Sequence, residues 1–390
     1  MMCSVFVAKD RLFIVFRVFS LFITVCFCWV TLAIDGVVNK PVVDLSDRLY
    51  LRAQVVAAPA RRGVSCCSRM HQALFNERVS VIRMINNHTA EVAMDDLIYS
   101  VSAAEKKPLN SFIISLDDVT LLSRLTTYQK RAIPLQQERG GRVVVLKKPW
   151  NGYSFGTRFV VDELQYRRKD RLVPVLLLVD PLRDPIVMRI PRNYVFEEKL
   201  LSIGEQRVLF VNLAYELIAD AQKSGGVIPY VWGGCSYVAP YTDSYQISEH
   251  GWVRERNQPF YSGFDCSELV YRLARMVGSE YKGKVSSLAP QLLPEVPQNE
   301  PILAGDIIWM PGHIMIVGNM KNNEVIEARG YSSGFGCVHC TKVSKLFKNM
   351  KTCEEVRAAG KAHKSLVLCN RDGKASSEIA SLKFLRLFDI

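Results

Sequence analysis

Three polar residues stand out because their types and surroundings could support nucleophilic catalysis. Cys266 lies in the sequence DCSELV, His313 opens the apolar run HIMIV, and Glu327 lies in the run VIEAR. A cysteine thiolate can attack a carbonyl when an imidazole takes its proton, and a carboxylate can hold that imidazole in the required orientation. The three residues therefore predict a cysteine hydrolase or transferase.

The residues around Cys266 predict that it occupies the first position of a helix. A Gly263-Phe264 break precedes Asp265 and Glu268, whose spacing fits a helix capping box, and apolar residues then recur at helical spacing. Unpaired N–H groups and the helix dipole stabilise a thiolate at such a position. The alternative is a buried and unreactive cysteine, which is common in protein cores.

His313 and Glu327 are expected to face one another across a β-hairpin. The segment NMKNN between them is a turn signal, and a turn about Met320 would pair His313 directly with Glu327. Glu327 could then fix the tautomer and orientation of the imidazole. A slip of one residue would place an apolar side chain opposite His313, so the register tests the hypothesis.

The elements that must position these residues form an α+β domain over residues 201–390. The apolar pattern changes from alternation to helical periodicity near residue 200, which marks the domain boundary. Before it, residues 35–70 are basic and irregular, whereas 70–110 and 111–200 each carry short strands separated by turn signals, as in small β-barrels. A helix is expected at 204–223. Strands are expected at 143–146, 157–161, 173–179, 306–310, 313–317, 325–329 and 381–388.

Composition and charge narrow the class of protein. The chain has 390 residues, 49% hydrophobic, and carries a formal net charge of +12, so it is globular and suited to an anionic neighbour. Neither a zinc finger nor an RNA-binding aromatic motif accompanies that charge, so no nucleic-acid partner is expected. The anionic neighbour would be a phospholipid surface or an acidic cell-wall polymer.

The first 34 residues predict export. Lys9, Arg11 and Arg17 precede an apolar run from Val18 to Ile34, which is typical of a signal peptide. The run lacks a good small-residue cleavage site, so an uncleaved membrane anchor is the alternative.

Eight of the 11 cysteines lie beyond this segment. Two are adjacent, Cys66 and Cys67, and in an oxidising compartment the cluster near the end of the chain favours disulfides. A zinc site at Cys337-Val338-His339-Cys340 is the alternative, but it lacks the second close pair of a zinc ribbon, and we expect no metal or cofactor. The cluster comprises Cys337, Cys340, Cys353 and Cys369.

Five motifs in this order resemble the NlpC family of bacterial cell-wall cysteine peptidases. They are YVWGG from Tyr230, DCS from Asp265, AGDII from Ala304, HIMIV from His313 and VIEA from Val325. The resemblance implies a multidomain protein, in which β-barrel SH3-like domains precede an α+β papain-like cysteine peptidase domain. It also implies cleavage of peptidoglycan stem peptides, typically between γ-D-glutamyl and a diamino acid.

The resemblance also implies roles for the three residues that could do the chemistry. Cys266 would be the nucleophile, His313 the base and Glu327 the third residue, a position more usually occupied by histidine in the family. Two long insertions, residues 235–261 and 336–380, depart from the family pattern and could reshape the groove.

Four further residues are implied to contact the substrate. Tyr230 looks like the tyrosine that lines the site near the oxyanion, and Ser267 like a residue that contacts substrate. Asp265 is similar to the aspartate that receives the amino terminus of the substrate, although it could equally be a helix cap. Trp232 would be either a pocket wall or part of the core.

The leading hypothesis is a cysteine endopeptidase of peptidoglycan or muropeptides, acting through a thioester in the periplasm or cell envelope, with possible membrane association through the first 34 residues. One alternative is a papain-like acyltransferase or amidase. Another is a noncatalytic wall-binding protein, against which the intact cysteine, histidine and glutamate argue.

Overall fold

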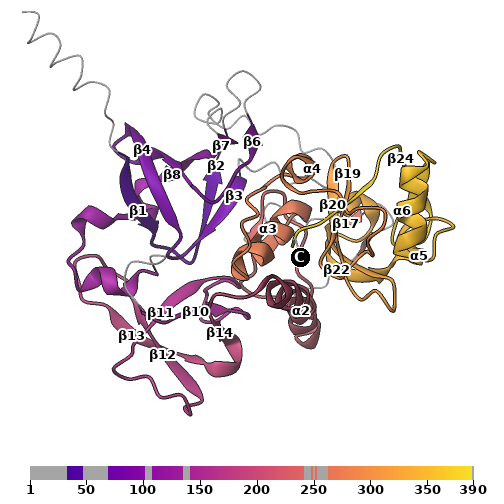
Figure 1. Ribbon diagram of the computed structural model, residues 1–390. Coiled ribbons are helices and arrows are strands. Elements are labelled where there is room, and N and C mark those ends of the chain that lie inside the picture. The colour runs from indigo at the N-terminus through magenta and orange to yellow at the C-terminus, as the bar shows by residue number, and fades with distance from the viewer. Residues whose placement is uncertain are drawn as a thin grey trace, which may run out of the picture.

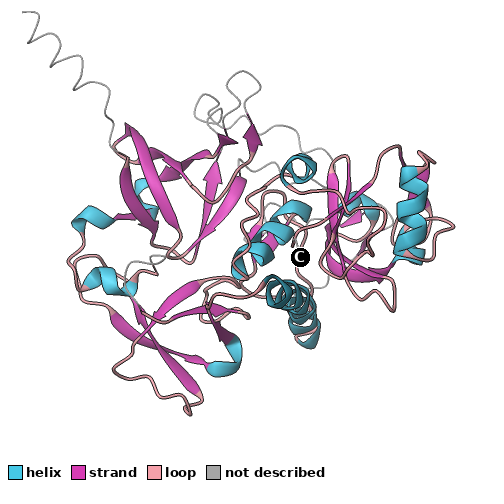
Figure 2. Cartoon of the chain, in the orientation of Figure 1, coloured by secondary structure: helices cyan, strands magenta, loops and turns pink. Residues whose placement is uncertain are grey.

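A computed structural model describes residues 33–46, 69–101, 108–134, 141–240, 247–248, 251–252 and 262–388. Within them the chain forms two β-rich units followed by an α+β unit (Figures 1 and 2). The helices of this part of the chain are all too short or too polar to cross a membrane. The predicted signal peptide or anchor lies almost wholly outside the described residues, as do Cys66 and Cys67.

The first β-rich unit is a seven-stranded antiparallel sheet in the order β3-β2-β8-β5-β4-β1-β9. Two of its strands lie within residues 35–70, which the sequence had indicated to be irregular, and two lie beyond residue 110. Its strands are β1 (Ile34–Val38), β2 (Val42–Ser46), β3 (Arg69–Leu74), β4 (Arg78–Asn86), β5 (Thr89–Ala93), β8 (Ser111–Ser115) and β9 (Val119–Leu121), and a separate pair is β6 (Ser100–Val101) and β7 (Pro108–Leu109).

The second unit is a five-stranded antiparallel sheet in the order β13-β12-β11-β10-β14, packed around its own apolar core. The strands predicted at 143–146, 157–161 and 173–179 are confirmed. Neither β-rich unit closes on itself within the described residues, so the expected SH3-like barrels are not confirmed. The strands are β10 (Val143–Leu146), β11 (Arg158–Val161), β12 (Leu172–Leu177), β13 (Ile186–Pro191) and β14 (Val195–Glu197).

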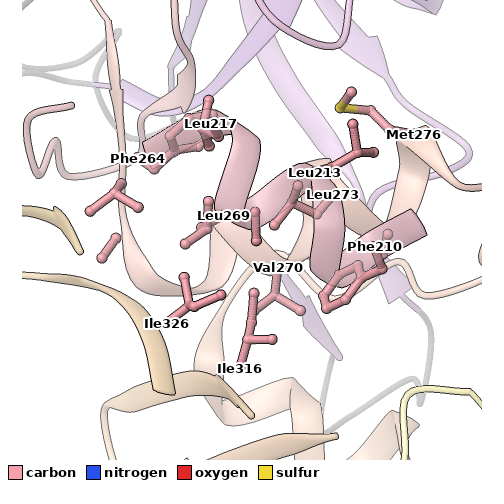
Figure 3. Close-up of a cluster of buried hydrophobic side chains, with 14 of the residues drawn as sticks. Phe210, Leu213, Leu217, Phe264, Leu269, Val270, Leu273, Met276, Ile316 and Ile326 are labelled. Carbon is pink, nitrogen blue, oxygen red and sulfur yellow. The ribbon is translucent and has the colours of Figure 1, made fainter. Parts of the chain in front are cut away.

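Two helices pack on one face of a five-stranded sheet in the α+β unit, in the order β22-β21-β20-β19-β25. The helix predicted at 204–223 is α2 (Ile203–Lys223), which begins at a capping box on Ser202. It packs with α3 (Cys266–Met276) on apolar residues of the sheet, including Ile316 and Ile326 (Figure 3). The strands are β19 (Ile307–Met310), β20 (His313–Val317), β21 (Glu324–Arg329), β22 (Cys337–Lys342) and β25 (Lys383–Leu385).

The insertion at 336–380 supplies the edge strand β22 and covers the second face of the sheet. Its apolar residues join a separate core with Met315, Val317 and Val325. The sheet is therefore buried on both faces. The elements that follow β22 are α5 (Val343–Leu346), α6 (Cys353–Lys361), β23 (Leu366–Cys369) and β24 (Ala375–Ile379), and shorter elements elsewhere are β15 (Cys235–Ser236), β16 (Ile247–Ser248), β17 (Gly251–Trp252), β18 (Gly263–Phe264) and α4 (Ala289–Leu292).

The expected disulfides are absent from the described residues, where all six cysteines are free thiols. Cys337 and Cys340 are three positions apart on one strand, so their side chains leave opposite faces of the sheet. Cys353 and Cys369 are buried in other elements. The second long insertion, 235–261, lies largely outside the described residues.

Candidate active site

Cys266 is the first residue of α3, as the sequence predicts. Asp265 caps this helix, because its Oδ1 accepts a hydrogen bond of 2.8 Å from the backbone N–H of Glu268. The predicted capping box is only half formed. The Glu268 side chain turns away from the helix end and bonds instead to His71 and Lys284.

The strands β20 and β21 bring His313 and Glu327 together, but not in the predicted register. Ile316 pairs with Ile326 and Val317 with Val325, so continued pairing sets Glu327 opposite Met315, two residues from His313. The turn is centred on Lys321 instead of Met320, with Gly318 N–H bonded to Glu324 O at 2.8 Å. A shift of two residues leaves side chains on the same face, so Glu327 still reaches the imidazole.

The side chains of His313 and Glu327 are in direct contact. Nε2 of His313 lies 2.5 Å from Oε2 of Glu327, which leaves Nδ1 for Cys266. The carboxylate is fully buried, whereas 17% of the imidazole side chain is exposed. The imidazole is therefore partly accessible to solvent, and its carboxylate partner is not.

The electrostatic environment favours a protonated His313. Burial alone lowers its pKa, but the charge of Cys266, a hydrogen bond with the Cys266 side chain and the Glu327 carboxylate raise it to about 10. Burial raises the pKa of Glu327, yet the imidazoles of His313 and His339 hold that pKa far below its usual range. The arrangement suits a thiolate–imidazolium pair supported by a permanent carboxylate.

His339 is a neighbour of this site that sequence reasoning missed. It lies on β22 directly opposite Glu327, and its Nε2 is 3.2 Å from Glu327 Oε1. The sequence indicated His339 only as part of a possible zinc motif. The length of the segment between β21 and β22 decides their register, and no local pattern reports it.

Asp265 and Ser267 form a compact polar group beside Cys266. Asp265 is buried, and its oxygens accept bonds from Gly233 N–H at 3.0 Å, Ser267 Oγ–H at 3.0 Å and Glu268 N–H. Burial and then repulsion by Glu268 raise the pKa of Asp265 to about 6. Its contact with a substrate amino group stays a prediction, as does the contact of Ser267 with substrate.

The two predicted aromatic residues differ in exposure. Tyr230 is half-buried and packs on the core shared by α2 and α3, beside Gly330 at the end of β21. Trp232 is 57% exposed, which excludes the interpretation as a core residue. Its role as a wall of the substrate site remains a prediction.

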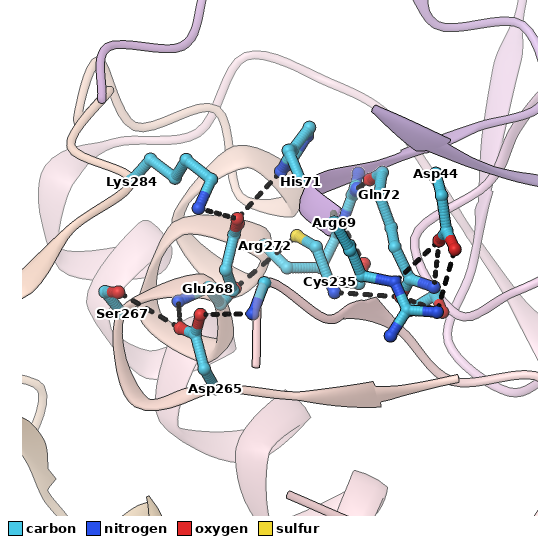
Figure 4. A network of polar contacts seen from close by, with 12 residues as sticks. Asp44, Arg69, His71, Gln72, Cys235, Asp265, Ser267, Glu268, Arg272 and Lys284 are labelled. Atoms are coloured by element: carbon cyan, nitrogen blue, oxygen red, sulfur yellow. Dashed lines mark hydrogen bonds and ion pairs between the residues drawn. The ribbon is translucent and has the colours of Figure 1, made fainter. Parts of the chain in front are cut away.

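A buried polar network connects the first β-rich unit to α3 (Figure 4). His71 Nδ1 on β3 lies 2.8 Å from Glu268 Oε1, and Lys284 Nζ lies 3.2 Å from the same oxygen. Arg272, buried in the same helix, pairs with Glu77 of the first unit. The amino-terminal β-rich unit thus supplies partners for charges on α3.

One group of side chains in the described residues has the spacing of metal ligands. Ligand atoms of His71, Cys235 and Glu268 lie within 4.8 Å of one another. The Lys284 ammonium already supplies a positive charge to Glu268, and burial raises the pKa of the Cys235 thiol well above its usual value. The Lys284 ammonium therefore supplies the positive charge that a metal ion would otherwise provide at this group.

Where the first β-rich unit packs on the α+β unit, the backbones of Gly233 and Arg69 are also in contact. Gly233, in the loop before β15, has a φ of 66°, and a Cβ built on it would lie 2.7 Å from the carbonyl oxygen of Arg69 on β3. A side chain does not fit in this space, and the left-handed backbone also favours glycine. The loop that carries Tyr230 and Trp232 thus rests directly on the first β-rich unit.

The solved structures that resemble this chain include three NlpC or NlpC/P60 proteins. A NlpC/P60 family protein from Bacillus cereus ATCC 10987 has 11% identity and a TM-score of 0.48, covering 79% of this chain and 94% of its own. NlpC1 and NlpC2 from Trichomonas vaginalis each have a TM-score of 0.30 and cover 80% of this chain, with 11% and 12% identity and 88% and 92% of their own lengths. No protein-family model and no curated protein matches the sequence.

Proposed function

We propose that the protein is a cysteine endopeptidase of peptidoglycan stem peptides. The observation that carries the proposal is the placement of Cys266 at the start of α3, beside an imidazole that a fully buried Glu327 holds at 2.5 Å. A structural cysteine needs no such partners, whereas a nucleophile needs a base and the base needs an orienting group. The motifs that resemble the NlpC family suggest the γ-D-glutamyl–diamino acid bond.

In the proposed mechanism, the site transfers an acyl group in two steps, which are formation of a thioester on Cys266 and its hydrolysis. The Cys266 sulfur adds to the peptide carbonyl carbon, the first backbone N–H groups of α3 stabilise the negative oxygen, and His313 donates its proton to the departing amine. A thioester and a free amine result. His313 then takes a proton from water, whose oxygen attacks the thioester and releases the carboxylic acid product and the thiolate.

The charge and the first 34 residues support the proposed substrate and location. A net charge of +12 favours an anionic wall polymer over a neutral substrate. A basic region followed by an apolar run at the amino terminus supports action in the periplasm or cell envelope.

Purified muropeptides incubated with the full chain test the proposal. We expect the wild-type protein to release a new amine and the corresponding shorter stem peptide, as followed by liquid chromatography and mass spectrometry. Cys266→Ala should abolish the product, while Cys340→Ala, which removes a half-buried thiol on β22, should leave it. Product from Cys266→Ala would refute the assigned nucleophile.

The same experiment separates the other two classes of function. Transfer of the acyl group to an added amine, in place of hydrolysis, would identify an acyltransferase. Retention of muropeptide without any cleavage would identify a wall-binding protein, and either result would overturn the proposed peptidase activity.

A further inference from the structure

We propose that His339 is a positioning residue of this site, which holds Glu327 so that one carboxylate oxygen stays directed at His313. The inference rests on the function proposed above and adds a fourth residue to the three that the sequence identifies. His339 acts through Glu327, so it needs no contact with the substrate.

The register of β21 and β22 places the two side chains together. Glu327 and His339 are directly paired across these strands, and such pairs have Cβ atoms about 5 Å apart on the same face. Nε2 of His339 lies 3.2 Å from Oε1 of Glu327, and Nε2 of His313 lies 2.5 Å from Oε2. Each oxygen of the carboxylate therefore faces a different imidazole.

His339 is the nearest available partner of Glu327 Oε1. Oε1 of Glu327 and Nε2 of His339 are both buried, and neither has a hydrogen-bond partner among the described residues, because their 3.2 Å approach lacks the geometry of a hydrogen bond. Arg329 Nη1 is 3.7 Å from the oxygen, which exceeds the length of a hydrogen bond. A buried carboxylate oxygen without a donor is costly, so a small rotation of His339 that completes the bond is favoured.

The ring of His339 is itself fixed. It stacks on Phe335 with ring centroids 3.9 Å apart and an angle of 5° between the planes. The guanidinium of Arg329 lies 5.2 Å from the centre of the same phenylalanine ring. These contacts limit His339 to motion in its ring plane, and a restrained donor orients its acceptor better than a mobile one.

The chemical nature of glutamate explains why a second partner is needed. A glutamate side chain has three rotatable bonds, one more than histidine, and loses more conformational entropy when it is held in one position. His313 alone fixes only one oxygen. With His339 on the other oxygen, the carboxylate cannot turn away while His313 gives up and regains its proton.

Substitution of His339 tests the inference with two measurements. His339→Ala should lower kcat on muropeptides about tenfold, the loss expected for a hydrogen bond to a charged group, with little change in KM. The pH at which iodoacetamide alkylates Cys266 at half its maximal rate should also rise, because a poorly held Glu327 stabilises the imidazolium less. Subtraction of the rate for Cys266→Ala removes the contribution of other thiols.

A conservative variant and a control separate positioning from stability. His339→Gln has an amide N–H that can reach Glu327, so it should recover most of the loss. His88→Ala removes an exposed histidine in the turn between β4 and β5 and should behave as wild type in both measurements. Thermal unfolding of each variant shows that the fold is retained.

The outcomes that would overturn the inference are distinct from failure of the proposed function. Wild-type kcat and alkylation profile in a folded His339→Ala, or equal losses in the Gln and Ala variants, would refute it. Losses that multiply when Glu327→Gln and His339→Ala are combined would refute it as well, because partners in one contact are not independent. The alkylation profile needs no peptide substrate, so it tests His339 even if muropeptides are not cleaved.

Discussion

At the scale of residues, Glu327 organises the site. Its carboxylate is fully buried, yet its pKa lies far below the usual range because the imidazoles of His313 and His339 outweigh the cost of burial. A permanent negative charge behind the base keeps a proton on His313. In the proposed mechanism, the imidazole is then ready to protonate the leaving amine before substrate binds.

Glu327→Gln should expose this contribution. We expect kcat to fall about 10- to 100-fold, because the neutral amide cannot make the charged hydrogen bond to His313, which is worth about 1.5–3 kcal/mol. Without the carboxylate the pKa of His313 falls from about 10, so the alkaline limb of kcat/KM moves to lower pH. A pH–rate profile checks both effects, and an unmoved alkaline limb would contradict the role of Glu327.

At the scale of elements, Asp265 both caps the amino-terminal end of α3 and connects it to a neighbouring loop. Asp265 caps the helix and ties it to Gly233 in the loop that carries Trp232. The aspartate is buried near Glu268, and this raises its pKa to about 6. A raised pKa means that Asp265 contributes most to stability when protonated, below its ordinary pKa of 3.8, and that this contribution is lost as pH rises through about 6.

A pair of substitutions at Asp265 separates capping from substrate binding. Asp265→Asn keeps a cap acceptor and Asp265→Ala does not, so the alanine variant should be less stable by about 1–2 kcal/mol in denaturant unfolding. Relative to wild type, the asparagine variant should gain stability as pH rises from about 4 to about 6, because it lacks the buried charge.

The substrate role predicted for Asp265 has its own readout. If the carboxylate receives an amino terminus, Asp265→Asn should lower kcat/KM for stem peptides with a free amine and leave that for N-acetylated peptides nearly unchanged. Equal effects on both substrates would restrict Asp265 to its structural task.

At the scale of the whole molecule, the first β-rich unit is joined to the α+β unit by buried ion pairs with α3. Arg272 on α3 is buried and pairs with Glu77, while Glu268 pairs with His71 on β3. The charges on this helix are therefore compensated by residues nearly 200 positions earlier in the chain. Removal of one partner leaves a buried charge without compensation.

Glu77→Gln should therefore destabilise the protein by about 3–5 kcal/mol at neutral pH. Burial raises the pKa of Glu77, but Arg272 and then Arg275 lower it to about 2. The stabilisation is present above the ordinary pKa of 4.5 and is lost as pH falls toward 2, so the stability of the variant should depend less on pH in this range. Denaturant unfolding at pH 7 and pH 3 measures the difference.

A surface ion pair near Glu77 provides the control for this prediction. Arg78 and Asp35 are 58% and 41% exposed, so Arg78→Gln should cost no more than about 1 kcal/mol. Equal effects of Glu77→Gln and Arg78→Gln would contradict a coupling of the β-rich unit to α3 through buried charge.

Local patterns predicted the elements that carry the site, and long-range pairing decided the rest. The cap at Asp265 and the apolar run from His313 are local signals, and both elements begin where the sequence indicates. The register of β20 and β21, which places Glu327, depends on where the turn between them is centred, and the residues of the turn did not determine that position. His339 and His71 reach the site through strand order and unit packing, which no single segment of the sequence reports.

The contact at Gly233 has a consequence for how such a chain can evolve. The backbone of Gly233 lies so close to Arg69 that a β-rich unit with a differently shaped surface at this point would not fit against it. Recombination at the boundary near residue 200 would join the α+β unit to a foreign β-rich unit that collides with the loop or leaves it unsupported. The two parts are therefore expected to be inherited together, and new specificities to arise through the insertions rather than through exchange of whole modules.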